Sequence, residues 1–88
     1  MAKLRWSLLA RQDVREIADY IAQGSSFYSQ RTIEKFFFRV GLLEQFPAMG
    51  RIVPEFSNEK IREVIEGNYR IVYSITKEEI VVLRIHHS

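Results

Sequence analysis

The sequence predicts an α+β domain in which two helices cover one face of a β-sheet. Three observations support this: an alternating segment near the N-terminus, two amphipathic segments in the first half, and three β-rich segments in the second half. Helices that are bunched in sequence before a strand meander pack on one side of the sheet. We therefore expect an N-terminal strand, a two-helix hairpin and an antiparallel three-stranded meander, with all strands in one sheet.

The first strand and the first helix follow from hydrophobic periodicity. Residues 3–8 alternate apolar and polar side chains, with Trp6 and Leu8 on the apolar face, which predicts a half-buried strand. Residues 11–23 have the spacing of an amphipathic helix. The apolar stripe of this helix consists of Val14, Ile17, Ala18 and Ile21. Gly24 stands where a glycine commonly ends a helix.

A second helix is predicted from its caps and its apolar stripe. Ser25 and Ser26 are suited to cap its start, and the helix extends to about Gln45, before Pro47. Its stripe consists of Ile33, Phe36, Phe37, Val40 and Leu43. Gly41 inside the helix costs about 1 kcal/mol relative to alanine. Close approach of another element would explain this glycine.

The second half of the chain reads as three strands. They cover residues 61–66, 69–76 and 80–86, with a two-residue hairpin signal at 67–68 and a turn at 77–79. The last strand is apolar on both faces, which predicts a central, buried position in the sheet.

Length and composition limit the class of protein. The 88 residues predict a single domain, residues 1–88, and their 47% apolar content excludes a disordered chain. No cysteine is present, which excludes a disulfide scaffold and a thiolate metal site. The N-terminal residues lack the apolar run of a secretory signal, and no apolar run is long enough to span a membrane. We expect a cytoplasmic protein with no membrane partner.

The charge pattern favours a local anion site over a broad basic surface. Thirteen Lys and Arg stand against 11 Asp and Glu, for a net charge of +2, and the two signs are mixed along the chain. The last strand and tail, residues 80–88, carry Arg84, His86 and His87 without an acid.

The second hairpin predicts which of these side chains share a face. A three-residue turn places Arg70 opposite His86 and Val72 opposite Arg84, on the face away from Ile71. Two guanidiniums and an imidazole on an open face suit phosphate binding and proton transfer. The alternative is an ordinary polar face whose arginines pair with Glu63 or Glu66.

Other polar and aromatic residues have simpler interpretations beside functional ones. Arg51 is either a binding residue or a cation favoured by a helix dipole. Asp13 and Glu16 suit the start of the first helix, and Trp6 and the phenylalanines of the second helix fit the core. The sequence has no glycine-rich phosphate loop, metal-ligand spacing or serine-nucleophile motif, so we expect neither a metal nor a cofactor.

Several short motifs, in order over nearly the whole chain, resemble the RelE/ParE toxins of bacterial and archaeal toxin–antitoxin modules. These motifs are Trp6 with Ala10, Asp13, Ile17 and Tyr20-Ile21; Phe46-Pro47-x-x-Gly50-Arg51; Pro54-Glu55; Ile61-Arg62-Glu63; Tyr69-Arg70-Ile71-Val72-Tyr73; and a last strand ending in His86. The fold of that family, a sheet with a two-helix hairpin, agrees with the prediction from periodicity.

The resemblance implies a growth-inhibiting toxin of the plasmid stabilisation type, neutralised by a cognate antitoxin that itself binds operator DNA. ParE-like members inhibit DNA gyrase, whereas RelE-like and YoeB-like members cleave mRNA on the ribosome without a metal. The Gly50-Arg51 loop, Arg62-Glu63 and the scarcity of lysines on the predicted sheet favour the ParE-like branch. A ribosome-dependent endoribonuclease is the alternative, and an inactive toxin-fold binding module is a third.

Strand pairing and the resemblance together give the candidate site residues. Arg51, Arg62, Arg70 and Arg84 are the candidates for binding a target or a phosphate. If the protein is a ribonuclease, Glu55, Arg70 and His86 match the carboxylate, arginine and histidine of the YoeB-like branch. His87 stands where that branch has a tyrosine. Glu55 or His86 would then take the 2′-hydroxyl proton, the arginines would stabilise the phosphorane, and His86 or His87 would protonate the leaving oxygen.

Overall fold

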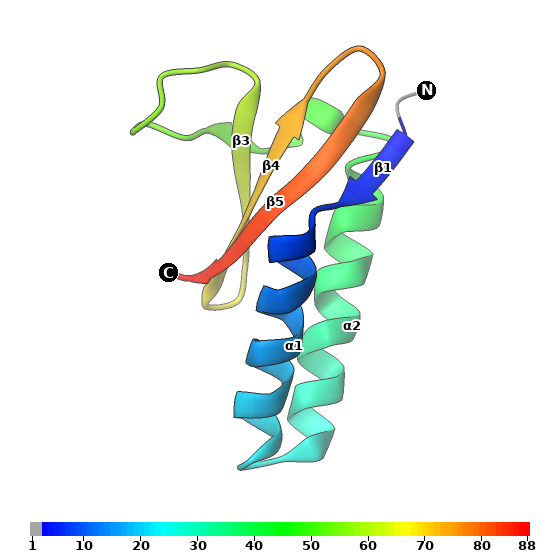
Figure 1. The fold of residues 1–88 in the computed structure, drawn as a ribbon, viewed down its shortest axis with the longest axis vertical. Coiled ribbons are helices and arrows are strands. Elements are labelled where there is room, and N and C mark those ends of the chain that lie inside the picture. The colour runs from blue at the N-terminus through cyan, green and yellow to red at the C-terminus, as the bar shows by residue number, and fades with distance from the viewer. Residues whose placement is uncertain (1–2) are drawn as a thin grey trace.

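The computed structural model of the protein describes residues 3–88 and contains two helices, a 3₁₀ turn and five strands. In chain order these are β1 (Lys3–Trp6), α1 (Leu8–Ala22), α2 (Ser26–Leu42), η1 (Pro47–Met49), β2 (Arg51–Ile52), β3 (Ile61–Glu66), β4 (Tyr69–Ile75) and β5 (Glu79–His87). All strands belong to one sheet, in the order β1-β5-β4-β3-β2. The α1–α2 hairpin lies along one side of the sheet, and its tip projects beyond the strands (Figure 1). The predicted α+β architecture is confirmed, with β2 as an additional short strand.

Strand β1 makes the sheet mixed. It pairs in parallel with β5, with Leu4 opposite Ile80 and Trp6 opposite Val82, whereas β3, β4 and β5 form the antiparallel meander. Strand β5 is therefore flanked by β1 and β4, as its two apolar faces predict.

The first helix begins earlier than predicted, because Ser7 is its cap. The Ser7 hydroxyl accepts the Ala10 N–H at 3.0 Å and donates to the Leu83 carbonyl at 2.9 Å. One side chain thus ends β1, starts α1 and ties both to β5. Leu8 lies on the helix and is 63% exposed, so its predicted place on a buried strand face is wrong.

The second helix has the predicted cap but a different end. The Ser25 hydroxyl accepts the Tyr28 N–H at 3.1 Å, which confirms the cap, and α2 ends at Leu42 rather than near Gln45. A Cβ added to Gly41 would meet no other atom within 4 Å. The predicted close approach at Gly41 is therefore wrong.

The core lies between the helical hairpin and one face of the sheet. Phe36, Val40 and Leu43 from the helical side pack against Ile71, Tyr73, Ile80, Val82 and Ile85 from the sheet. Phe37 departs from the prediction: it is 54% exposed and packs against Trp6, with 5.1 Å between the ring centroids. Three consecutive phenylalanines cannot all face one side of a helix, and only Phe36 takes the buried position.

A β-bulge sets the register of the last hairpin. Tyr73 lies opposite Val82, but Val72 lies opposite Arg84, so Leu83 is the extra residue on β5. The turn before β5 is one residue longer than predicted, since Ile75 pairs with Ile80. The bulge compensates for this difference, and the predicted pairing of Arg70 with His86 is confirmed.

No helix in the described part of the chain is long and apolar enough to cross a membrane.

Candidate functional site

The face of the sheet turned away from α1 and α2, here called the open face, carries a row of paired positions across four strands. Arg51 on β2 lies opposite Glu63 on β3, Glu63 lies opposite Val72 on β4, and Val72 lies opposite Arg84 on β5. Residues that are opposite one another point to the same side of a sheet. The row therefore holds three charged side chains and one apolar side chain, Val72, and Arg70 and His86 form a further pair on the same face.

Glu63 holds two of these arginines. Its side chain has no exposed surface, and one carboxylate oxygen, Oε2, lies 2.6 Å from both Nε and Nη2 of Arg51. The other oxygen, Oε1, accepts a hydrogen bond from Nη1 of Arg70 at 3.1 Å. A buried carboxylate is stable only when it is paired and hydrogen-bonded. The pairing with Glu63, given above as the simpler alternative for the sheet face, is thus present for Arg70, and Glu63 also binds Arg51, for which a helix-dipole role was the simpler expectation.

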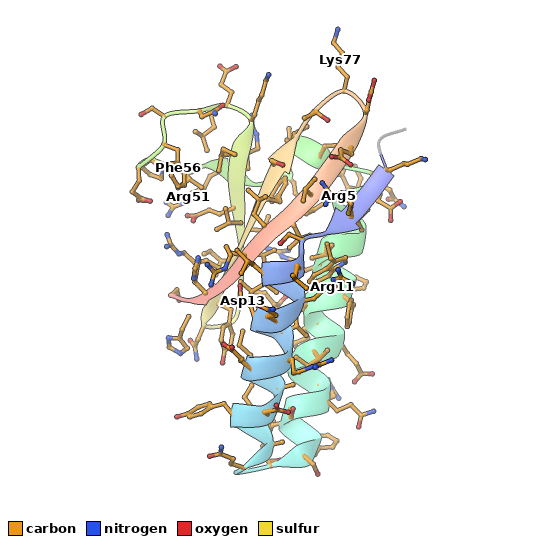
Figure 2. All side chains as sticks on the ribbon, in the orientation of Figure 1. Arg5, Arg11, Asp13, Arg51, Phe56 and Lys77 are labelled. Atoms are coloured by element: carbon orange, nitrogen blue, oxygen red, sulfur yellow. The ribbon has the colours of Figure 1, made fainter. Side chains whose placement is uncertain are left out.

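Asp13 holds the third arginine from the helical side. Its two carboxylate oxygens accept Nε and Nη2 of Arg84 at 2.8 and 3.1 Å, and one of them also accepts the Ile85 N–H at 2.9 Å. Asp13 lies where β5 crosses α1 (Figure 2). Burial raises the pKa of Asp13, but the hydrogen bonds from Arg84 and Ile85 and the Arg84 charge outweigh burial and lower it below 3.8. Asp13 joins α1 to β5, which the helix-dipole interpretation did not anticipate.

A cavity of about 480 Å³ lies on the open face, and we call it the open-face cavity. The loop between β2 and β3 forms one wall and the strands form the floor. Its lining residues are Val53, Glu55, Phe56, Asn58, Ile61, Glu63, Arg70, Val72, Leu83, Arg84 and His86. Four of the predicted site residues therefore share one cavity: Glu55, Arg70, Arg84 and His86.

Three other predicted residues lie outside the lining of this cavity. His87 is on the opposite face, edge-on to Tyr69 with 5.2 Å between ring centroids. Arg62 also faces away from the open face, and its guanidinium donates to the carbonyls of Gly50 at 2.9 Å and Glu59 at 3.1 Å. Arg51 lies at the margin, bound to Glu63. The structure thus separates His87 and Arg62 from the cluster to which sequence reasoning assigned them.

A second concave surface, the hairpin groove, lies between α1, α2 and β1. It encloses about 890 Å³ and is lined by Arg5, Trp6, Leu8, Arg11, Val14, Arg15, Ala18, Asp19 and Phe37. Its floor is apolar. Arg5 is paired with Glu79 at 3.2 Å, so Arg11 and Arg15 against Asp19 give the lining a net positive charge. Figure 2 shows Arg5 and Arg11 on the opposite side of the molecule from Arg51 and Phe56. Sequence reasoning missed this groove, although the run Phe36–Phe38 already required exposed aromatic surface.

Among residues 3–88 no group of three His, Asp or Glu side chains is arranged to hold a metal ion. The titratable groups that line the open-face cavity are carboxylates, arginines and an imidazole.

The sequence model of the ParE toxin of the type II toxin–antitoxin system parDE matches residues 4–88. The chain belongs to the ParE toxin family. It is thus a toxin of the type II toxin–antitoxin class with the ParE/RelE fold, as the sequence motifs implied. A search of curated proteins finds no matching sequence.

Solved structures agree with the fold of a ParE toxin. A chain of the chromosomal ParDE system from P. aeruginosa superposes with a TM-score of 0.80 at 21% identity, covering 99% of this chain and 96% of that chain. A chain of the RelBE2 toxin–antitoxin complex from Mycobacterium tuberculosis superposes with a TM-score of 0.66 at 22% identity, covering 99% of this chain and 98% of that chain. A chain of the E. coli DinJ-YafQ complex superposes with a TM-score of 0.68 at 15% identity, covering 99% of this chain and 93% of that chain. These likenesses support the ParE/RelE fold for the whole domain.

Proposed function

We propose that this ParE-family toxin arrests growth by binding DNA gyrase, and that a cognate antitoxin neutralises it. The observation that carries the proposal is that three arginines of the open face are already bound in ion pairs. Arg51 and Arg70 are bound by Glu63, and Arg84 is bound by Asp13. A nuclease needs cations that are available to a phosphate in the transition state.

The free-energy cost of separating these ion pairs also favours a protein target over a nucleic acid. Glu63 has a fully buried carboxylate, and drawing both arginines away from it would leave an unpaired charge in the protein. Breaking a buried ion pair by removing a partner costs about 3–5 kcal/mol. A phosphodiester that recruited Arg51 and Arg70 would have to supply this free energy. A protein target faces no such cost, because it can use the cavity's apolar lining and leave the ion pairs intact.

A metal-independent mRNA endoribonuclease is the second candidate, since Glu55, Arg70 and His86 line one cavity. In this case Glu55 or His86 would take the 2′-hydroxyl proton and Arg70 would hold the phosphate. His87, on the opposite face, is poorly placed to be the acid. A third candidate, an inactive toxin-fold binding module, predicts no growth arrest when the chain is produced alone.

One experiment separates the three. The chain is expressed alone from an inducible promoter, and the arrested cells are examined for gyrase-trapped DNA breaks with an SOS response and for transcripts cut at codon boundaries. The proposal predicts the breaks and intact transcripts. Cut transcripts without breaks would establish the nuclease, and unchanged growth would establish the inactive module.

We further propose the hairpin groove as a docking surface for the antitoxin. Its apolar floor includes Trp6 and Phe37, and its rim carries Arg5, Arg11 and Arg15. These features suit an acidic segment that buries an apolar face as it folds on binding. The groove and the open-face cavity lie on different sides of the domain, so the antitoxin and the target need not share contacts (Figure 2).

A further inference from the structure

The contacts of Glu63 resemble those of a bound phosphate. Its two carboxylate oxygens are each directed at a different guanidinium: Oε2 at Nε and Nη2 of Arg51, and Oε1 at Nη1 of Arg70. Two non-bridging phosphate oxygens would make the same type of contact with the same two arginines. The carboxylate comes from the central part of β3, so the pairing forms whenever the sheet folds.

We infer that Glu63 is the specificity-determining residue of the open face, because it occupies an anion site with its own carboxylate and thereby excludes nucleic acid. Without that charge, Arg70 in the open-face cavity and Arg51 at its margin would form a phosphodiester-binding pair. The inference concerns a class of ligand that the open face does not bind, nucleic acid, and it goes beyond the proposal that gyrase is the target.

The surroundings of Glu63 favour this role over a purely structural one. Arg51 has a side chain that is 65% exposed and Arg70 one that is 33% exposed, so both guanidiniums lie within reach of an external anion. The position opposite Glu63 on β4 is Val72, which offers no competing acceptor. Removing the Glu63 charge leaves no buried charge unpaired, because water can reach both of the partly exposed guanidiniums that remain.

The test measures binding of a fluorescently labelled single-stranded RNA 12-mer to purified protein as salt is varied. The variants are Glu63→Gln and Glu63→Leu, which remove the charge and keep much of the volume. Glu78→Gln is the matched control, because it changes the net charge equally from the exposed turn between β4 and β5. Circular dichroism checks that each variant is folded.

Each phosphate contact on a single strand adds about 0.7 to the slope of log affinity against log salt. Two released arginines should therefore steepen the slope by about 1.4 and tighten binding about tenfold at low salt. The additional substitution Arg70→Met in Glu63→Gln should remove about half of the gain in slope. Glu78→Gln should leave the slope unchanged.

RNA affinity in both Glu63 variants that is no higher than in Glu78→Gln would overturn the inference. Loss of folding in both would overturn it as well, because Glu63 would then be required for the fold and not for ligand choice. No gyrase is present in this assay, so its outcome is distinct from that of the growth-arrest experiment.

Discussion

Arg70 and His86 face each other across β4 and β5, as the third residue pair beyond a bulge that shifts the register of the two strands. The bulge at Leu83 decides which side chains of β5 reach the open face. If the register of the Tyr73–Val82 pair continued without the bulge, Arg70 would lie opposite Ile85 and the open-face cavity would lose its imidazole. The geometry of the candidate site therefore depends on a local irregularity of the backbone.

Substitution of Arg70 separates the two target classes. Arg70→Lys keeps a positive charge beside Glu63 but loses the fork that can bind two phosphate oxygens. If the target is gyrase, we expect this variant to arrest growth nearly as well as the original protein. A nuclease would lose most of its activity. The growth rate after induction, at matched protein levels, distinguishes the two results.

Arg70→Ala should weaken the fold measurably. It removes a hydrogen bond to a buried charged group, and such bonds contribute about 1.5–3 kcal/mol. Arg51 still binds Glu63, so we expect a folded protein whose free energy of unfolding is reduced by about 1–2 kcal/mol. Urea unfolding checks this value, and an unchanged midpoint would show that Arg70 does not stabilise Glu63.

The pairing of Asp13 predicts a pH dependence of stability. The pKa of Asp13 is lower in the folded protein than the ordinary value of 3.8, so the carboxylate stabilises the fold above that pH. Stability is then lost as the pH falls through the folded pKa. Asp13→Asn should reduce the free energy of unfolding at pH 7 by about 1–2 kcal/mol, since Arg84 is partly exposed. Its loss of stability between pH 4 and about pH 2 should be smaller than that of the original protein.

Two glycines offer a matched pair of alanine substitutions with opposite expected signs. A Cβ on Gly50 would lie 2.5 Å from the Tyr73 hydroxyl oxygen and 2.7 Å from the Glu63 carbonyl oxygen. Gly50→Ala should therefore cost about 2–3 kcal/mol. It would also disturb the Tyr73 hydroxyl, which donates to the Pro47 carbonyl at 2.7 Å and accepts the Gly50 N–H at 2.9 Å.

Gly41→Ala should raise stability by less than about 1 kcal/mol, because its Cβ meets open space in the last turn of α2. Thermal melts of the two variants give the comparison. Equal destabilisation by both would contradict the packing described for the loop before β2.

Charge reversal tests the hairpin groove. Arg11→Glu combined with Arg15→Glu should weaken antitoxin binding at least tenfold, because an acidic segment would meet like charges on the rim. Lys77→Glu, in the turn before β5, is a control for charge. Both proteins should still arrest growth. In the original protein, saturating antitoxin should raise the melting temperature, because it binds only the folded state.

Much of the fold was predictable because hydrophobic periodicity reports on which face is buried. The meander and the face containing Ile71 and Tyr73 follow from alternation alone. The start of α1 was not predictable in this way, since Ser7 serves both as a helix cap and as a partner of Leu83 in β5. Strand β2 has only two residues, which is too short to show any period.

The candidate site was predictable as a set of neighbours but not as a set of charge pairs. Strand register placed Arg70 next to His86, whereas the ion pair between Asp13 and Arg84 joins residues 71 positions apart. No local sequence pattern predicts a contact between residues so far apart in the chain. The side on which His87 lies follows from alternation along β5, because it succeeds His86 directly.

The most direct test of the account incubates the purified toxin with purified DNA gyrase, ATP and plasmid DNA. Linear plasmid trapped in covalent complex with gyrase is then measured after detergent and protease treatment. The account predicts that trapped DNA increases with toxin concentration and that prior addition of the antitoxin abolishes it. Undisturbed gyrase supercoiling, together with cleavage of a reporter mRNA on translating ribosomes by the same toxin preparation, would contradict it.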